Sequence, residues 1–199
     1  MRPSPRRLWP AIASGLLLTA PLTAQERPLV VIDPGHGGSE AGVVAGDIIE
    51  KDVILEVAFV IGAEFAMAGY DVHYTRTRDV EVAGADRRGQ AEAAGAVALF
   101  MLHAMQNDDP AVGGAEIYFD EATPHSVELS AAVAEQIRAL GIGAAEIPRE
   151  SAFLKSQTVP TAMIELVHLT NPRESDLIRD AAFQHRIGAA LVAALEATR

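Results

Sequence analysis

Apolar positions along the chain follow two patterns that succeed each other in turn. One is a short apolar run, and the other is a longer stretch with helical spacing. Strands are predicted where apolar residues form short runs or alternate with polar ones, at 29–33, 71–75, 97–102, 115–119 and 161–166. Helices are predicted at 50–68, 86–94 and 126–140, each followed by a glycine, and across a last helical region at 171–195. Strands that alternate with helices predict an α/β fold with helices on both faces of the sheet.

Two connecting segments have a less regular sequence. Residues 35–46 contain five glycines, which allow a backbone to wrap closely round a site. Residues 142–158 predict a loop that carries a short strand near Phe153. No repeat, low-complexity run or linker divides residues 25–199, so we expect them to form one compact domain with a sizeable core.

The first residues have the composition of an export signal. Three arginines precede a mostly apolar stretch at 8–18, and Ala24 supplies a small residue at the expected cleavage point. This pattern predicts a signal peptide over residues 1–24 and export to the periplasm or cell envelope. The apolar stretch is short and interrupted by proline, serine and glycine, so we expect no transmembrane anchor.

Charge and cysteine content narrow the classes of partner and ligand. The chain has 16 basic and 27 acidic residues, a net charge of −11. Residues 1–24 hold three of the basic residues and no acidic one, so the mature charge is 13 − 27 = −14. This charge argues against nucleic-acid binding and gives no attraction to an anionic membrane or wall polymer. Because the chain has no cysteine, a metal site would use imidazole and carboxylate ligands.

Three candidate metal ligands lie where predicted elements begin or end. His36 follows the first strand in a glycine-rich turn, Glu50 opens the first helix, and His103 ends a very apolar strand. Taken singly, His103 favours a hydrogen-bonded structural histidine, but functional groups gather beyond the carboxyl ends of strands in an open α/β sheet. Two imidazoles and a carboxylate bind zinc and leave a position for water. We therefore predict a Zn²⁺ site and a hydrolase.

Glu165 is a fourth candidate, because it interrupts an apolar run that predicts a buried strand. A buried carboxylate is unfavourable by several kcal/mol unless it is paired or lies near a cation. Burial would raise its pKa and suit a general base, whereas a salt bridge to Lys155 or Arg173 is the structural alternative. His168 follows closely and suits either the same cleft or a structural role, and His73 and His185 suit the surface.

The segments that carry these residues resemble the zinc-dependent N-acetylmuramoyl-L-alanine amidases, whose α/β catalytic domain cuts peptidoglycan. The matching segments are 31–38, 50–52, 74–76, Arg87 with 94–96, 99–104, 114–118, 154–155, 164–165 and 170–172. The resemblance spans about residues 29–195, which is essentially the whole chain after the predicted signal peptide. It implies that His36, Glu50 and His103 bind zinc, that Glu165 is the catalytic carboxylate, and that a twisted, mostly parallel sheet has about six strands.

The same resemblance implies a substrate, the amide that joins the lactyl group of N-acetylmuramic acid to the L-alanine of the stem peptide. Two alternatives stay open, a zinc peptidase acting on stem peptides or cross-links, and a non-catalytic wall-binding or activator module with the same fold. No wall-binding domain accompanies the catalytic one in the sequence, so we expect recruitment through a partner, such as a protein activator, or by diffusion. We expect a monomer.

Overall fold

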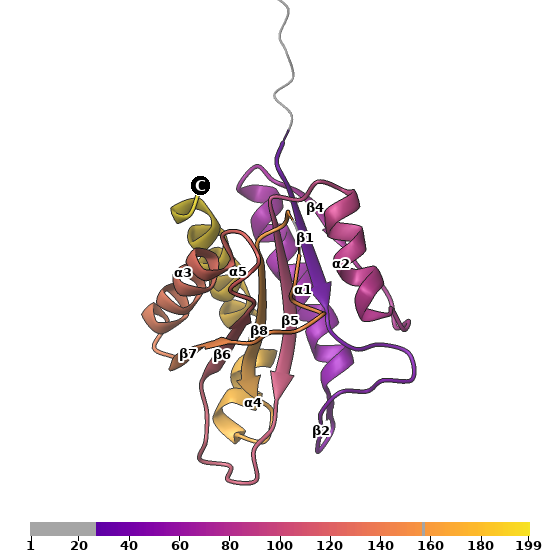
Figure 1. Ribbon diagram of the computed structural model, residues 1–199. Coiled ribbons are helices and arrows are strands. Elements are labelled where there is room, and N and C mark those ends of the chain that lie inside the picture. Colours follow the sequence, from indigo (N-terminus) through magenta and orange to yellow (C-terminus); the bar gives the residue numbers. More distant parts are fainter. Residues whose placement is uncertain (1–26, 157) are drawn as a thin grey trace, which may run out of the picture.

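A computed structural model describes residues 27–156 and 158–199 of the chain (Figure 1). The predicted signal peptide, residues 1–24, lies outside the described residues. Within the described part of the chain, no helix is both long and apolar enough to cross a membrane.

A six-stranded sheet forms the centre of the described residues, in the order β4-β1-β5-β8-β6-β7. The strands are β1 (Leu29–Pro34), β4 (Asp71–Tyr74), β5 (Ala98–Met105), β6 (Ala115–Phe119), β7 (Ala144–Pro148) and β8 (Thr161–His168). Neighbouring strands are parallel except β6 and β8, which are antiparallel. The strand direction rotates steadily from β1 to β7 (Figure 1), as expected of a twisted sheet. This architecture confirms the predicted fold class.

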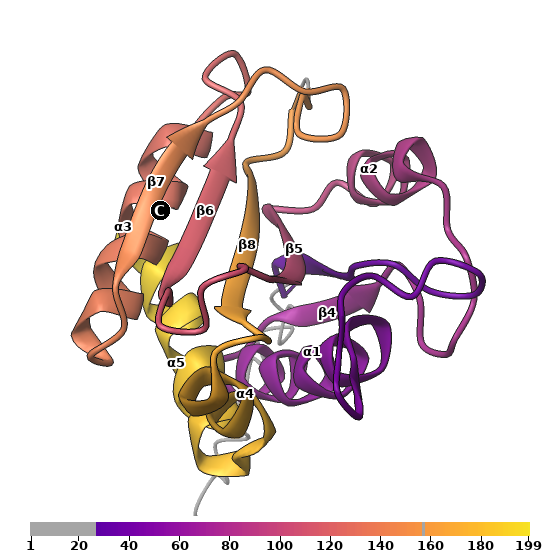
Figure 2. The same ribbon diagram turned by 90° about the horizontal axis from the view of Figure 1, so that it is seen from below.

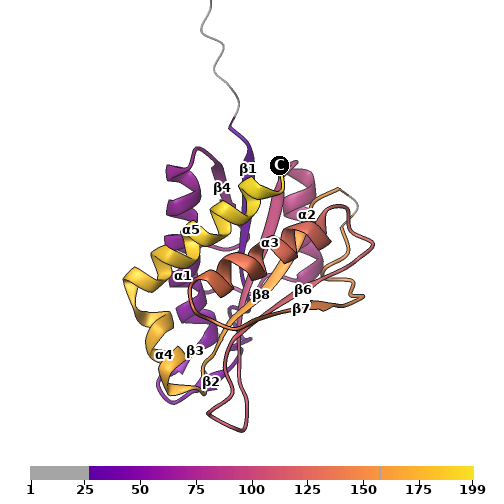
Figure 3. The ribbon, with the colours of Figure 1, turned by 90° about the vertical axis from the view of Figure 1, so that its left-hand side faces the viewer.

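Helices cover both faces of the sheet, as predicted. They are α1 (Glu50–Met67), α2 (Gly84–Ala93), α3 (Ser126–Ala139), α4 (Pro172–Arg179) and α5 (Ala181–Ala197). Figures 2 and 3 show α1, α3 and α5 together on one face, while α2 lies alone on the other, over β1 and β5. The half of the α2 face formed by β8, β6 and β7 is therefore left to loops.

Alternation along the strands divides the core between the two faces. Val30 and Phe100 are fully buried in the large core under α1, α3 and α5, whereas Val31, Leu99 and Met101 belong to a smaller cluster under α2. His103 is the next residue after Leu99 and Met101 on the same face of β5. The alternation therefore places its imidazole on the α2 face of the sheet, which is the more open one.

Residues 142–158 contain a strand, but its position differs from the prediction. The strand is β7, at Ala144–Pro148, whereas Phe153 lies in a turn and is exposed. The prediction near Phe153 was wrong because β7 is an edge strand that pairs only with β6. An edge strand buries little of its surface and therefore needs only a weak apolar pattern.

Two further details were absent from the predicted elements. The glycine-rich loop leads into a small antiparallel hairpin, β2 (Val44–Ala45) with β3 (Ile48–Ile49). The last helical region is broken at Asp180, whose backbone is extended and whose carboxylate caps α5 by accepting a hydrogen bond from the Phe183 N–H at 2.8 Å.

Candidate metal centre

His36 occupies a strained turn at the carboxyl end of β1. Its φ is 56°, in the left-handed region that non-glycine residues rarely adopt. The preceding turn is tied to β5, because the Gly35 N–H donates to the Leu102 carbonyl at 2.8 Å. The side chain of His36 is 27% exposed, so its ring lies at the edge of the fold and opens to solvent.

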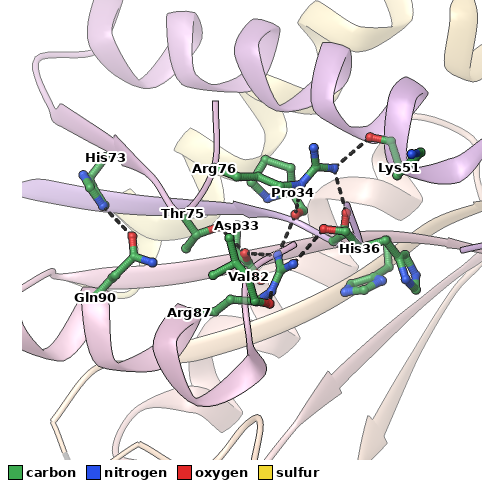
Figure 4. Close-up of polar contacts among 12 residues, drawn as sticks. Asp33, Pro34, His36, Lys51, His73, Thr75, Arg76, Val82, Arg87 and Gln90 are labelled. Carbon is green, nitrogen blue, oxygen red and sulfur yellow. Dashed lines mark hydrogen bonds and ion pairs between the residues drawn. The ribbon is translucent and has the colours of Figure 1, made fainter. Parts of the chain in front are cut away.

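Two buried arginines hold this turn from opposite sides (Figure 4). Arg87 on α2 donates to the carbonyls of Pro34 and His36, each at 2.7 Å, and pairs with Asp33 at 2.7 Å. Arg76 donates to the carbonyls of Pro34 at 3.0 Å and Gly35 at 2.8 Å. Charge-assisted hydrogen bonds of this kind fix carbonyls more firmly than neutral ones. The strained backbone of His36 is therefore determined by its surroundings.

Glu50, the first residue of α1, is buried at the centre of the cluster. Its Oε1 lies 3.1 Å from His36 Nε2 and 3.2 Å from His103 Nδ1. The same carboxylate accepts hydrogen bonds from the N–H groups of Ala104 at 3.0 Å and Val43 at 2.8 Å. Burial alone would raise the pKa of Glu50, but the hydrogen bonds from His103, His36 and these backbone groups lower it to about 2. Glu50 is therefore an anion throughout the neutral range.

His103 joins this cluster from β5, and its ring packs edge-on against His36 with centroids 4.9 Å apart. Burial lowers the pKa of His103, but the hydrogen bond to Glu50 and the charges of Glu165 and Asp33 outweigh it, so the net direction is upward. His36, Glu50 and His103 thus converge as the sequence predicts, and one donor atom from each lies within 4.8 Å of the other two.

The donor set and its spacing fit a metal ion. Ligand atoms about 2.0–2.1 Å from a tetrahedral zinc lie roughly 3.3 Å from one another, close to the separations between Glu50 Oε1 and the two imidazole nitrogens. The surrounding loop is shaped round this cluster, because a Cβ added at Gly42 would collide with Glu50 and come within 2.7 Å of the His36 ring. Histidine and carboxylate ligands are also the set that zinc accepts in hydrolytic sites.

Glu165 lies beside His103, because the two residues are register partners on β8 and β5. Its Oε2 is buried and has no hydrogen-bond partner among the described residues. Burial raises the pKa of Glu165, Glu50 and Glu116 add to this effect, and the two imidazoles oppose it. No ion pair with Lys155 or Arg173 forms in the described part of the chain, so the structural alternative for Glu165 fails.

The other histidines lie outside this cluster. His73 and His185 are exposed, as predicted, and they contact Gln90 at 2.9 Å and Glu64 at 2.6 Å. His168 is buried and lies 3.7 Å from Glu174, whose carboxylate also accepts from the His168 N–H. His168 therefore has the structural role that the sequence left open.

A cleft of about 340 Å³ opens beside His36 and His103 on the α2 face of the sheet. Its other lining residues include Glu40, Glu81, Arg87, Met101, Arg149, Phe153 and Met163. The sequence predicted the candidate metal ligands at one end of the cleft but did not indicate Arg149, which follows β7. The role of Arg87 in holding the His36 turn was not predicted either. A buried aspartate at a strand end requires a cationic partner, and Arg87 of α2 is that partner for Asp33.

The two imidazoles follow or end strands of a mostly parallel sheet, and Glu50 joins them from the start of α1. Glu165 adds a second carboxylate, whose Oε2 has no hydrogen-bond partner among the described residues. This arrangement is typical of a metal-dependent hydrolytic domain. Residues 30–197 match the family described as N-acetylmuramoyl-L-alanine amidase. The match spans most of the chain, and the chain belongs to this family.

Individual relatives agree with this assignment. N-acetylmuramoyl-L-alanine amidase LytC of Bacillus subtilis is 26% identical over 168 residues, which are 81% of this chain and 34% of LytC. This chain therefore spans about a third of that relative's length. The structure of the amidase AmiC2 of Nostoc punctiforme is 27% identical, with a TM-score of 0.77, covering 85% of this chain and 96% of AmiC2. An N-acetylmuramoyl-L-alanine amidase from Clostridium difficile 630 is 25% identical, with a TM-score of 0.78, covering 87% and 97%.

Proposed function

We propose that this chain is a zinc-dependent hydrolase of peptidoglycan, which cleaves the amide between N-acetylmuramic acid and the L-alanine of the stem peptide. Family membership supports the substrate class. The observation that carries the chemistry is the convergence of His36, Glu50 and His103, with Glu165 next to them and one of its oxygens unpaired among the described residues.

The three proposed ligands have fixed positions. Glu50 is held by the N–H groups of Val43 and Ala104, and His36 is held through its backbone by Arg87. A zinc ion bound by the three residues would lower the pKa of a coordinated water and polarise the scissile carbonyl. Because the side chains of His36 and His103 are 27% and 17% exposed, a substrate can approach from the cleft side.

Glu165 is the proposed general base and acid. Its carboxylate takes a proton from the attacking water and then gives that proton to the departing amine of L-alanine. Burial raises the pKa of Glu165. A raised pKa makes the carboxylate a better proton acceptor for general base catalysis near neutral pH. Its Oε2, which has no hydrogen-bond partner among the described residues, leaves an acceptor available for this transfer.

The test is a digest of purified peptidoglycan by zinc-loaded protein, followed by identification of the new chain ends. We expect intact stem peptides with a free L-alanine amine, and loss of release after zinc is removed by a chelator. Cuts only inside stem peptides would favour the zinc peptidase. Binding to the wall with no released peptide would favour the non-catalytic module.

We further propose that residues 1–24 direct export and that residues 25–199 act as a monomer in the periplasm or cell envelope. The composition of the first residues supports the first point. The amino-terminal sequence of protein recovered from the envelope fraction tests it, because processing would expose a new end near Gln25. Sedimentation of the processed protein tests the second.

A further inference from the structure

The cleft continues along the sheet away from the metal centre. His103, Glu165 and Glu116 form one row across β5, β8 and β6, since each is the register partner of the next. The adjacent row on the same face is Met101, Met163 and Tyr118. Met101 and Met163 line the cleft, so its floor beyond the metal end is apolar.

Arg149 lies on the wall of this extension. Its guanidinium stacks over the Tyr118 ring, 4.2 Å from the centroid, and its backbone N–H donates to the Phe119 carbonyl at 2.8 Å. The hydroxyl of Tyr118 in turn donates to the Glu116 carboxylate. Arg149 is exposed. Its position is nevertheless fixed by a backbone hydrogen bond and by the stacking of its side chain on Tyr118.

Arg149 differs from the other arginine that lines the cleft. Arg87 is occupied by Asp33 and by backbone carbonyls, including those of Pro34 and Val82. The guanidinium of Arg149 has no carboxylate partner and donates no hydrogen bond within the described residues. Its planar fork of donors is thus free for an external carboxylate, the ligand that a guanidinium binds most specifically.

Two other lining residues have the reverse charge. Glu40 and Glu81 also line the cleft, and the chain as a whole has a net charge of −11. A substrate carboxylate is repelled by these two residues and by most of the surface. Because Arg87 is already paired, Arg149 is the described lining arginine that can receive it.

The row order also indicates which part of the substrate reaches Arg149. Glu165 gives its proton to the leaving amine, so the stem peptide departs on the Glu165 side of the metal ligands. Measured from Glu165, Tyr118 lies on the neighbouring strand, roughly 5 Å across the sheet, and two residues along it, roughly 7 Å at ordinary strand spacings. That distance corresponds to about two extended peptide residues.

We propose that Arg149, stacked on Tyr118, forms a subsite for a carboxylate of the stem peptide, one or two residues beyond the L-alanine. This inference rests on the proposed function, because it takes Glu165 as the proton donor to the leaving group. Arg149 acts as a specificity residue that contacts the substrate directly.

Two synthetic substrates test the subsite, N-acetylmuramoyl-L-alanyl-glycine with a free carboxylate and the same compound as its carboxamide. For zinc-loaded wild-type protein we expect a kcat/KM about 10- to 100-fold higher on the carboxylate, the size of one charge-assisted hydrogen bond. Arg149→Gln should raise KM for the carboxylate and so remove this preference, with a much smaller change in KM for the carboxamide. Arg149→Lys should restore part of it, because it keeps the charge and loses the planar fork.

Arg186→Gln is the matched control. Arg186 is also exposed and also lies over an aromatic ring, 5.6 Å from the Phe183 centroid, but on α5, which packs with α1 and α3 on the other face of the sheet. This variant should keep the wild-type preference. Equal rates of wild-type protein on both substrates, or equal losses on both in Arg149→Gln, would overturn the subsite.

Calorimetry separates failure of the subsite from failure of the proposed function. If wild-type protein cleaves neither substrate, L-alanyl-glycine and its carboxamide are titrated into the same proteins, and the proposed reaction is refuted if purified peptidoglycan also stays intact. Tighter binding of the carboxylate by wild-type protein, lost in Arg149→Gln, supports the subsite without any turnover. Equal affinity for the two peptides in wild-type protein refutes it.

Discussion

His103 on β5 and Glu165 on β8 are register partners on neighbouring parallel strands. The register shifts immediately afterwards, between His103 and Met105, so this pair is the last regular rung before an irregularity in the ladder. Their separation is set by backbone hydrogen bonds, which hold adjacent strands about 4.8 Å apart. A proposed metal ligand and the proposed proton carrier are therefore positioned by one rigid element.

Glu165→Gln tests the role of this pair. The amide has nearly the shape of the carboxylate but takes up no proton, so we expect kcat on peptidoglycan to fall by roughly 10²- to 10⁴-fold with zinc content unchanged. Glu116→Gln, one strand away, is the control, and it should retain most activity. Comparable losses of kcat in both variants would show that the reaction depends on the negative charge of this region and not on proton transfer by Glu165.

The ligand assignment predicts metal content. His36→Ala and His103→Ala should each lower bound zinc well below one ion per chain, because two of three donors hold a metal weakly. His73→Ala, which removes an exposed histidine of β4, should keep the wild-type content. Atomic absorption on dialysed protein measures this, and full zinc occupancy in both ligand variants would rule the assignment out.

Two glycines of the same loop provide a matched pair. Gly42 and Gly46 have φ of 70° and 62°, so alanine is strained by a similar amount at either position. A Cβ at Gly42 would collide with Glu50 and His36, whereas at Gly46 nothing lies within 4 Å. We expect Gly42→Ala to lose zinc affinity, and Gly46→Ala to lower stability by only about 1 kcal/mol. Titration with a zinc-sensitive dye distinguishes them, and equal affinities would contradict the proposed packing.

The Arg87 clamp predicts a large effect on stability. Arg87→Gln removes the ion-pair partner of the fully buried Asp33, and breaking such a pair typically lowers stability by about 3–5 kcal/mol. The double variant Asp33→Asn with Arg87→Gln should recover part of that loss. Urea unfolding of the metal-free proteins gives the coupling, and strictly additive losses would mean that the two side chains act independently.

The metal-free protein should lose stability in acid. The pKa of Glu50 is lowered from 4.5 to about 2, so its contribution is present above pH 4.5 and is lost as the pH falls towards 2. The size is on the order of 3 kcal/mol. The raised pKa of His103 has the opposite sign, because its contribution is full at low pH and is lost as the pH rises through that pKa. Thermal melts of wild-type and Glu50→Gln protein across pH 2–6 should differ most above pH 4.5 and converge as the pH falls towards 2.

The sheet and the convergence of the candidate metal ligands could be predicted because their signals are local. An apolar run followed by His36 or His103 marks a strand end. Glu165 stands out because a carboxylate inside such a run is unfavourable unless it is paired or lies near a cation. The observed β1, β5 and β8 differ from the predicted bounds by at most three residues. Strand ends of this kind converge by the topology of open α/β sheets, so the cluster followed from the fold.

The missed features depend on contacts between distant segments. Arg149 lies in a loop after an edge strand, and its position over Tyr118 requires the β6–β7 pairing, which the weak pattern of residues 144–148 does not reveal. The break at Asp180 had a local signal, an aspartate at a helix start, but it is obscured by helical residues on both sides.

The two methionines on the floor of the cleft have a consequence for substrate tolerance. Met101 and Met163 present unbranched thioethers, which change rotamer at little cost and adapt to surfaces of different shape. In the proposed complex, a stem peptide lying over them would be bound at its ends, by the reacting amide and by a carboxylate, and its intervening side chains would contact these adaptable thioethers. The proposed subsite would therefore accept stem peptides that differ in composition, provided that their backbones span the same length.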